Sequence, residues 1–453
     1  MVKPSSSEGA AAPDPEAMTP ISVGREDDSD GKRSQLPKWR RYVILFIVSW
    51  NCFVVITTST SVLIATPEIS AELSTTPAII NVTNSGVLLA MGLSPMIWAP
   101  LSDMFSRRIA YSLTIAFLFI TSIGTAVSHN FATFTAMRLL TGLTGAYFMV
   151  SGQTIIADIF KPLVRGRAVG CMMVGSVAGG ALGPCIGGII ITFSSWRSVY
   201  WLQTAQSGLG LILTLCFIPD IRSTVAQRRF SPLRVFTLFM RPQVILADLT
   251  CGFLALTQYG LLSSVRHIIN PRFHLTTPLI GGLFYLSPAA GFVVGSLVGG
   301  RFSDRTAKQY LAKRGGVRLP KDRLNSGLVQ FFIVLPVSIL LYGWCLDKQF
   351  GGLALPIVMA FWVGMGLMGA FNGLNTYTAE VLPDLRAEVV CSKYIIQYVF
   401  GAAATACIIP MIDKVGVGYA FTIFGIMKIF GGLMVLLLAR FARDKGLWAS
   451  WLA

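Results

Sequence analysis

The sequence predicts an all-α integral membrane protein with twelve transmembrane helices in two pseudo-symmetric six-helix halves. Of its 453 residues, 53% are hydrophobic and 13% are charged, whereas a soluble chain carries about 25% charged residues. Twelve long apolar stretches follow one another, and a Ser-Asp motif with nearby arginines recurs six stretches apart. This composition excludes a chain built of soluble domains.

Each predicted span is a stretch almost free of Asp, Glu, Lys and Arg. A hydrocarbon core about 30 Å thick needs about 20 apolar residues per helix, and every stretch is of roughly this length or longer. The stretches are 42–67, 73–102, 109–137, 139–157, 168–196, 198–219, 249–265, 273–300, 324–346, 349–379, 394–412 and 415–439, the last being interrupted by Lys428.

Positive charge is distributed unevenly over the two sides of the predicted bundle. If residues 1–41 are cytoplasmic, the segments on that side hold 29 Lys and Arg, and the opposite segments hold 5. The positive-inside rule then predicts that both termini are cytoplasmic, and we expect the plasma membrane. The net charge of +16 is explained by basic loops that face anionic lipid, so we expect no nucleic-acid partner.

Composition divides the chain into five parts. We expect a disordered cytoplasmic tail (1–41), a six-helix half (42–219), a cytoplasmic central loop (220–243), a second half (244–440) and a C-terminal tail (441–453). The first tail is too polar to fold and too long for a cleavable signal peptide. Repeated halves are typical of secondary transporters, whose substrate site lies at midplane between them.

Motifs of enzymes and cofactor sites are absent from the sequence. The eight cysteines lie in apolar stretches and form no Cys-x-x-Cys pair, which predicts neither a disulfide framework nor a metal site. The phosphate loop, the His-Glu-x-x-His motif and the Gly-x-Ser-x-Gly elbow are also missing. We therefore expect no enzyme activity, no metal, no cofactor and no direct use of ATP.

Two loops in equivalent positions carry the recurring Ser-Asp motif. The pattern resembles the signature of the major facilitator superfamily between spans two and three, although Ala99 and Ser106 stand where glycine is usual. A carboxylate at a helix end can pair with Arg and with a neighbouring helix terminus, and such a contact can close a gate. The alternative is a turn with solvated charges. The charged candidates are Asp103, Arg107, Arg108, Asp304 and Arg305.

The fifth span is rich in glycine and contains one proline. Small residues allow close approach of helix backbones, and proline bends a helix. The segment 179–188 resembles the antiporter signature of drug:proton exchangers, and the resemblance implies export in exchange for protons. The alternative is helix packing without a transport role. The motif residues are Gly179, Gly183, Pro184, Gly187 and Gly188.

Further segments resemble the twelve-span fungal drug:proton antiporters, particularly their quinidine- and dityrosine-exporting branch. These segments are Trp196-Arg197, residues 299–326 and Asn375-Thr376-Tyr377, and the resemblance covers roughly residues 40–440. It implies a major facilitator fold, a small-molecule substrate, coupling to protons and a monomeric protein.

Three residues are candidates for handling the proton. Arg138 lies within the fourth span, where a charge costs roughly 2.5–3.5 kcal/mol, and the resemblance implies a proton-coupling role for it. Asp158 and Glu380 lie near the inner ends of spans four and ten. Alternatively, Arg138 reaches the outer interface, and the two acids complete cytoplasmic charge networks.

Lys393 marks a departure from the antiporter branch. The branch has paired Asn in span eleven, where this chain has Lys393-Tyr394, followed by Gln397. With no intramembrane acid evident beside it in sequence, Lys393 is predicted to recognise a carboxylate of the substrate. Alternatively it reaches the interface, or pairs with Glu388 or Asp384.

Other polar groups at membrane depth either line the cavity or hold helices together. For Lys428 in span twelve, the sequence likewise leaves open whether it pairs with other buried groups or takes part in function. Arg266 and His267 are expected at the outer interface rather than in the site. The candidate substrate-binding residues, with Lys393, are Asn51, Gln153, Asn375, Tyr377 and Gln397.

The sequence thus predicts a proton-coupled efflux transporter that works by alternating access. Its cargo is expected to be a small organic molecule, namely a drug-like compound, a secondary metabolite or an organic acid, and Lys393 favours the organic acid. Nutrient uptake by symport is an alternative, and a non-transporting membrane sensor is a weaker one.

Overall fold

The computed structural model describes residues 37–160, 162–218, 230–273, 278–313, 320–382 and 385–441. Helices make up nearly all of these ranges, and no strand occurs in them. Both predicted tails lie almost entirely outside the described residues.

The first six spans are formed by eight helices, because spans one and four are each interrupted once. These helices are α2 (Lys38–Thr60), α3 (Val62–Glu72), α4 (Pro77–Met104), α5 (Arg107–Ala126), α6 (Phe131–Gly142), α7 (Gly145–Ile159), α8 (Pro162–Phe193) and α9 (Arg197–Phe217).

The remaining helices form the central loop and the second half. They are α10 (Pro232–Leu238), α11 (Pro242–Arg272), α12 (Pro278–Phe284), α13 (Leu286–Lys313), α14 (Leu335–Lys348), α15 (Ala354–Glu380), α16 (Arg386–Val415) and α17 (Val417–Phe441), with a 3₁₀ turn (Pro320–Gly327) and a π turn (Gln330–Val334) leading into α14.

Side-chain caps define where several helices begin. The side chains of Thr76, Ser106 and Asn130 each accept a hydrogen bond from the backbone N–H three residues ahead, at the start of α4, α5 and α6. Such caps satisfy backbone donors that the first turn leaves unpaired. The local sequence therefore sets these helix starts.

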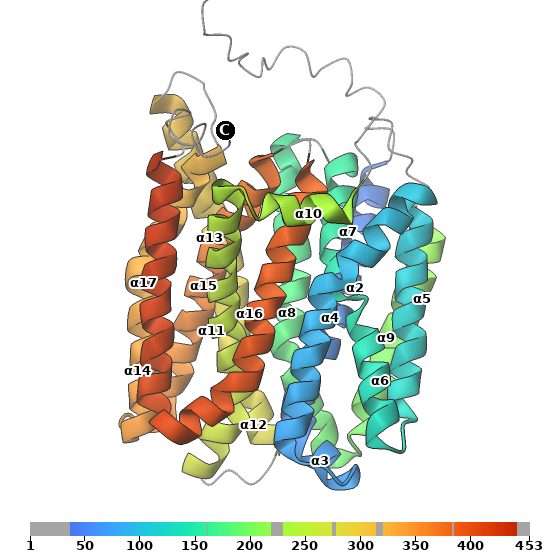
Figure 1. The fold of residues 1–453 in the computed structure, drawn as a ribbon, viewed down its shortest axis with the longest axis vertical. Coiled ribbons are helices and arrows are strands. Elements are labelled where there is room, and N and C mark those ends of the chain that lie inside the picture. Colours follow the sequence, from blue (N-terminus) through green and yellow to red (C-terminus); the bar gives the residue numbers. More distant parts are fainter. Residues whose placement is uncertain are drawn as a thin grey trace, which may run out of the picture. The chain divides into compact units, whose positions relative to one another are not determined.

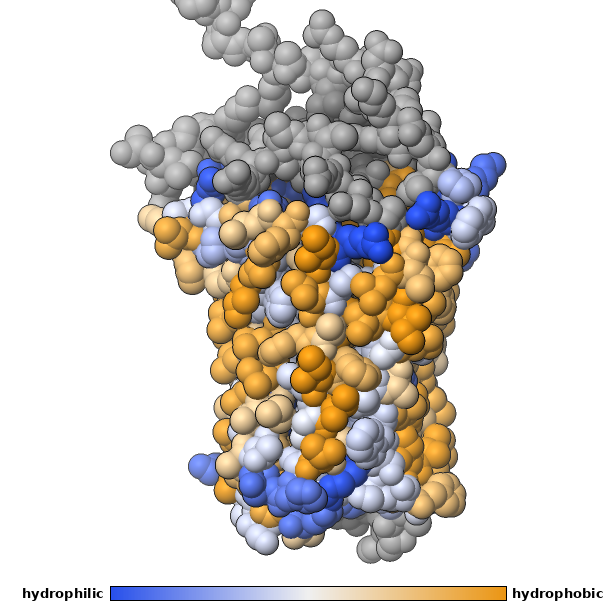
Figure 2. Space-filling model, turned by 90° about the vertical axis from the view of Figure 1, so that its right-hand side faces the viewer, coloured by the Kyte–Doolittle hydropathy of each residue, from blue (hydrophilic) through white to orange (hydrophobic). Residues whose placement is uncertain are grey.

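The helices cross the membrane as the sequence predicts. Eleven of the described helical stretches are long and apolar enough to span it. The sixth predicted span, α9, is not among these eleven, because it carries Gln203 and Gln206 and is less apolar. Figure 2 shows an apolar middle zone between polar ends. The chain is a multi-pass membrane protein, and the predicted fold class is confirmed.

Three helix pairs make the largest contacts between the two halves. α4 packs against α16, and α8 packs against both α12 and α13. In Figure 1, α10 lies across the upper end of the bundle, while α3 and α12 lie at the lower end. We call these the α10 end and the α12 end.

Glycines determine how closely α13 and α15 approach each other. A Cβ atom added at Gly291 of α13 would lie 2.1 Å from the backbone oxygen of Phe361 on α15. At Gly300, on the same helix, an added Cβ would meet no atom within 4 Å. The backbone contact therefore requires glycine at 291 and not at 300.

We expect Gly291→Ala to lower the melting temperature of the purified protein by several degrees, because overpacking a close contact costs about 1–3 kcal/mol. Gly300→Ala is the matched control and should leave the melting temperature unchanged or slightly higher, since Ala favours helix. Thermal unfolding followed by tryptophan fluorescence measures both. Equal shifts in the two variants would contradict the close packing of α13 on α15.

Candidate functional site

A buried lysine lies in the second half, close to the contact with the first. Lys393 of α16 is 1% exposed. Its Nζ donates to Oδ1 of Asn375 on α15 at 2.9 Å and lies 3.7 Å from the ring centroid of Tyr394. A hydrogen bond and an aromatic face thus stabilise this ammonium group.

An acid that the sequence did not single out lies beside this lysine. Asp248 of α11 is fully buried, and it interacts electrostatically with Lys393. Within the described ranges, neither of its carboxylate oxygens has a hydrogen-bond partner. The structure therefore places an intramembrane acid next to Lys393, where sequence reasoning found none.

Asp248 was overlooked because charged residues served as the boundaries of the predicted spans. The seventh span was expected to begin at 249, whereas α11 begins at Pro242. The apolar residues Val244, Ile245 and Leu246 precede Asp248. They could have indicated that the seventh span begins before Asp248 and includes it. Of the alternative partners proposed for Lys393, Glu388 pairs with Arg234 at 3.7 Å, and Asp384 lies outside the described residues.

The buried pair adjoins a contact between the halves. Tyr394, next to Lys393 in sequence, accepts a hydrogen bond from Gln153 of α7 at 3.3 Å and stacks on Tyr398. A Cβ at Gly92 of α4 would lie 3.1 Å from Tyr398. This stretch of α16 therefore packs directly against the first half.

The remaining predicted substrate residues lie in three places. Asn375 contacts Lys393, and Tyr377 is buried two residues further along α15. Gln397 is half-buried one turn beyond Lys393 on α16. Asn51 is fully buried and donates to Thr214 of α9 at 3.1 Å, so the structure groups it with packing inside the first half and not with Lys393.

Arg138 joins three helices of the first half to α6. It is 1% exposed, and it donates to the backbone oxygen of Thr58 on α2 at 2.7 Å and to Oδ1 of Asn84 on α4 at 3.0 Å. Its guanidinium also lies over the ring of Tyr200 on α9. Arg138 therefore lies inside the helix bundle, held by neutral polar groups.

At the α10 end, Asp103 ties the first half to the central loop. Its Oδ2 accepts from the backbone N–H of Phe230 at 2.6 Å. Arg107 interacts electrostatically with Asp103, whereas Arg108 donates to the backbone oxygen of Leu215 on α9. The signature aspartate thus contacts a loop backbone that sequence reasoning could not have paired with it.

The loop and α10 cover part of α16 at this end. Phe230 and Val235 form an apolar cluster with Ala99, Cys391 and Ile395, and Cys391 is fully buried. The segment predicted as the central loop contains α10 and bridges α4 to α16.

The equivalent motif of the second half forms a different network. Asp304 pairs with Arg323 at 3.3 Å, and Arg323 also approaches Glu380 at 3.9 Å. Arg305 is exposed. Glu380 therefore takes part in a charge network at the α10 end, and the side chain of Asp158 lies outside the described part of the structure.

The glycines of α8 occupy two faces of the helix. A Cβ atom added at Gly179 would lie 2.6 Å from the backbone oxygen of Phe53, and one added at Gly183 would lie 2.6 Å from Oγ1 of Thr60. Gly187 lies against Ile64. This face of α8 therefore packs on the first span. On another face, Gly188 would meet Pro278 O at 2.9 Å and Gly282 Cα at 3.0 Å, both in α12. Pro184 lies inside α8 and presents its backbone oxygen to Gly282. One helix thus makes close contacts within its own half and across to the other.

Ion pairs link elements at the α12 end. Both guanidinium nitrogens of Arg266 donate to Glu68 of α3, at 2.9 and 2.8 Å, across the two halves. Within the first half, desolvation opposes ionisation of Glu72, but hydrogen bonds from Arg197 and Trp196 hold its pKa below the ordinary value. The Arg266–Glu68 pair links the two halves at this end.

Lys428 of α17 is fully buried and donates to the backbone oxygen of Phe253 on α11. Among the residues that the structure covers, it forms no ion pair with an acid. It therefore joins α17 to α11 through a backbone group.

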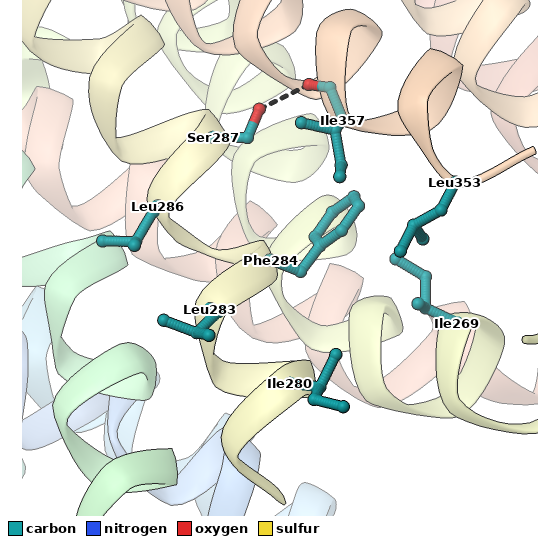
Figure 3. Close-up of a pocket in the computed structure, with 8 residues that line it drawn as sticks. All are labelled: Ile269, Ile280, Leu283, Phe284, Leu286, Ser287, Leu353 and Ile357. Carbon is teal, nitrogen blue, oxygen red and sulfur yellow. Dashed lines mark hydrogen bonds between the residues drawn. The ribbon is translucent and has the colours of Figure 1, made fainter. Parts of the chain in front are cut away.

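A pocket of about 360 Å³ lies at the α12 end of the second half (Figure 3). Seven of its lining residues are apolar, and the eighth, Ser287, donates to the backbone oxygen of Ile357. It has no charged lining group and is separate from Lys393. No group of three metal-ligating side chains gathers within the described ranges.

Comparison with known protein families decides the class. A model described as the Major Facilitator Superfamily matches residues 48–406. The chain belongs to this superfamily. It is therefore a transporter of the kind that binds small molecules, and not an enzyme.

Similar proteins of this superfamily occur in fungi. The "MFS-type transporter phiD" of a fungal species is 24% identical over 89% of this chain and 68% of its own length. The "MFS antiporter QDR3" of Candida albicans is 21% identical over 89% and 78%. The "Efflux pump radE" of Floropilus chiversii is 23% identical over 85% and 76%.

We expect Asp103→Ala to increase the rate at which Cys391 reacts with a membrane-permeant maleimide severalfold. The substitution removes the acceptor that holds Phe230, so the loop and α10 no longer shield the thiol. Mass spectrometry of labelled Cys391 in native membranes measures the rate. Asp304→Ala, in the equivalent motif of the other half, is the control, and equal protection in both variants would show that Asp103 does not hold the loop.

Proposed function

We propose that this superfamily member is a proton-coupled antiporter that exports a small organic molecule by alternating access. The observation that carries the proposal is the placement of the α8 motif, because its glycines pack against the first span on one face and against α12 of the other half on another. Relatives named as an antiporter and an efflux pump support the same direction of transport.

Two sets of contacts between elements can serve as opposing gates. At the α10 end, Asp103 binds the Phe230 backbone and Arg234 pairs with Glu388. At the α12 end, Arg266 pairs with Glu68. Alternating access requires that one end opens while the other stays closed, so each set must break in turn.

The charge distribution supports an orientation with the α10 end in the cytoplasm. The connections at that end include the basic central loop and the segment 301–323, which together hold most of the loop arginines and lysines. Both termini are then cytoplasmic, and the plasma membrane is the proposed location. Cargo would enter at the α10 end and leave at the α12 end.

The fungal resemblance supports a place near the quinidine- and dityrosine-exporting antiporters. A drug-like compound, a secondary metabolite or an organic acid fits that placement, and a monomer would suffice because both halves lie in one chain. The expectation of an organic acid rests on Lys393, whose charge is partly compensated by Asp248. The alternative function is nutrient uptake by symport. The two functions differ in whether an inward proton gradient drives the substrate out of the cell or into it.

We expect a strain that expresses the chain to release a compound that a strain without it retains, as seen in untargeted metabolite comparison of medium and cells. In right-side-out vesicles loaded with that compound, an inward proton gradient should accelerate efflux, and an ionophore that collapses the gradient should abolish the acceleration. Accumulation of the compound under the same gradient would instead establish symport.

We expect Gly188→Ala to reduce this efflux severalfold while the protein remains folded. The added methyl group would press against the backbone of α12 and hinder closure at that end. Gly170→Ala is the matched control on the same helix, because no atom lies within 4 Å of its added Cβ. Equal efflux by the two variants would show that close approach of α8 to α12 is not needed for transport.

A further inference from the structure

Asp248 is the buried acid that no role described so far explains. It is fully buried in α11, and both its oxygens lack hydrogen-bond partners among the described residues. The hydroxyl of the neighbouring Ser392 donates instead to the Val389 backbone oxygen at 2.9 Å. An unsatisfied buried carboxylate is costly, so this position is suited to receive a proton or a donor group.

Lys393 differs from Asp248 in that its ammonium group has a hydrogen-bond acceptor. Its ammonium donates to Asn375 and lies over the Tyr394 ring. It also supplies positive charge beside Asp248. The lysine can therefore hold the carboxylate ionised without occupying its acceptor oxygens.

We propose that Asp248 takes up and releases the coupling proton, and that the same carboxylate receives an ammonium or other N–H donor group of the cargo, with Lys393 as internal counter-cation. The inference rests on the antiport proposed above and specifies its proton site and cargo class. A proton leaves Asp248 as the cargo donor arrives from one side, and a proton from the other side displaces the cargo.

The sign of the coupling favours a cationic cargo over an anionic one. Exchange requires that proton and cargo oppose each other's binding, and this coupling is reciprocal. A proton and an ammonium group compete for one carboxylate. A cargo carboxylate beside Lys393 would instead add negative charge near Asp248 and favour its protonation, so proton and anion would bind together as in symport.

The surroundings of Asp248 hold few other titratable groups. From α16, Lys393 and Cys391 face it, and Cys251 lies one turn along its own helix. From α17, Lys428 reaches α11 at Phe253. α15 brings the neutral Asn375 to the Lys393 end of the pair. Lys393 is thus the cation that interacts with Asp248 among the described residues.

The position of the pair couples it to movement of the halves. Tyr394, adjacent to Lys393, bonds to Gln153 of the first half. Tyr394 and Tyr398 also present aromatic faces, which attract organic cations. Separation of the halves would therefore change the surroundings of Lys393 and open a cation-binding surface beside Asp248.

Infrared titration in nanodiscs tests the proton assignment. The carboxylic C=O band of the wild-type protein should include one component that titrates with pH and is absent in Asp248→Asn. In Lys393→Met this component should appear at higher pH, because the carboxylate loses its nearby positive charge. Asp347→Asn is the control and should retain the component.

The double variant Asp248→Asn/Lys393→Met guards against misfolding, since a buried ion pair can be replaced by neutral residues without loss of stability. It should unfold at a temperature near that of the wild type and lack the component. A component that persists in Asp248→Asn or in the double variant would overturn the proton assignment.

Calorimetry with 3-phenylpropylamine and 4-phenylbutyrate tests the cargo class, because the two probes differ mainly in charge. The amine should bind about tenfold more tightly at pH 8 than at pH 6 and lose this dependence in Asp248→Asn. Tighter binding of the carboxylate at low pH, or binding of neither probe, would overturn the assignment of a cationic cargo.

Flux separates this inference from the proposed function. If Asp248→Asn still exports the native compound and the ionophore still abolishes its acceleration, Asp248 is not the proton site and antiport stands. If the wild type itself ignores the ionophore, antiport fails. Loss of proton-driven export in Asp248→Asn, with the Asp347→Asn control active, is the expected result.

Discussion

Compensation of charge in a medium without water governs the interior of this transporter. Three buried cations within the spans are stabilised by different means: Arg138 by a backbone oxygen and an amide, Lys428 by a backbone oxygen, and Lys393 by an amide, an aromatic ring and a nearby acid. Charges at membrane depth persist only where the protein replaces their hydration. At Asp248 this replacement is incomplete, because both of its carboxylate oxygens lack a hydrogen-bond partner among the described residues.

Close helix approach is the second condition for function, and it acts at both interfaces of α8. Gly179 and Gly183 let α8 pack against the first span, while Gly188 lets the same helix contact α12. Since helices in lipid associate through packing rather than through the hydrophobic effect, small residues set how near the backbones come. A single helix thereby contacts both the first span and α12 of the other half.

Much of the fold could be predicted from the sequence because lipid imposes length and composition on every span. The same reasoning failed where a charged residue lies within a span, since Asp248 was treated as a boundary. The contact between Asp103 and the Phe230 backbone, and that between Asn51 and α9, depend on tertiary packing that local sequence does not encode. The motif resemblance pointed to the loop that contains Asp103 but could not identify its partners.

The bidentate contact between Arg266 and Glu68 has a consequence for the environment in which the transporter works. Both side chains are partly open to solvent, at 17% and 31% exposed, so dissolved ions screen their attraction. The closed arrangement at that end is therefore less favourable in saline surroundings than in dilute ones. Under the proposed alternating access, the salinity of the compartment beyond the α12 end thus becomes one of the variables that set the resting balance between the two states.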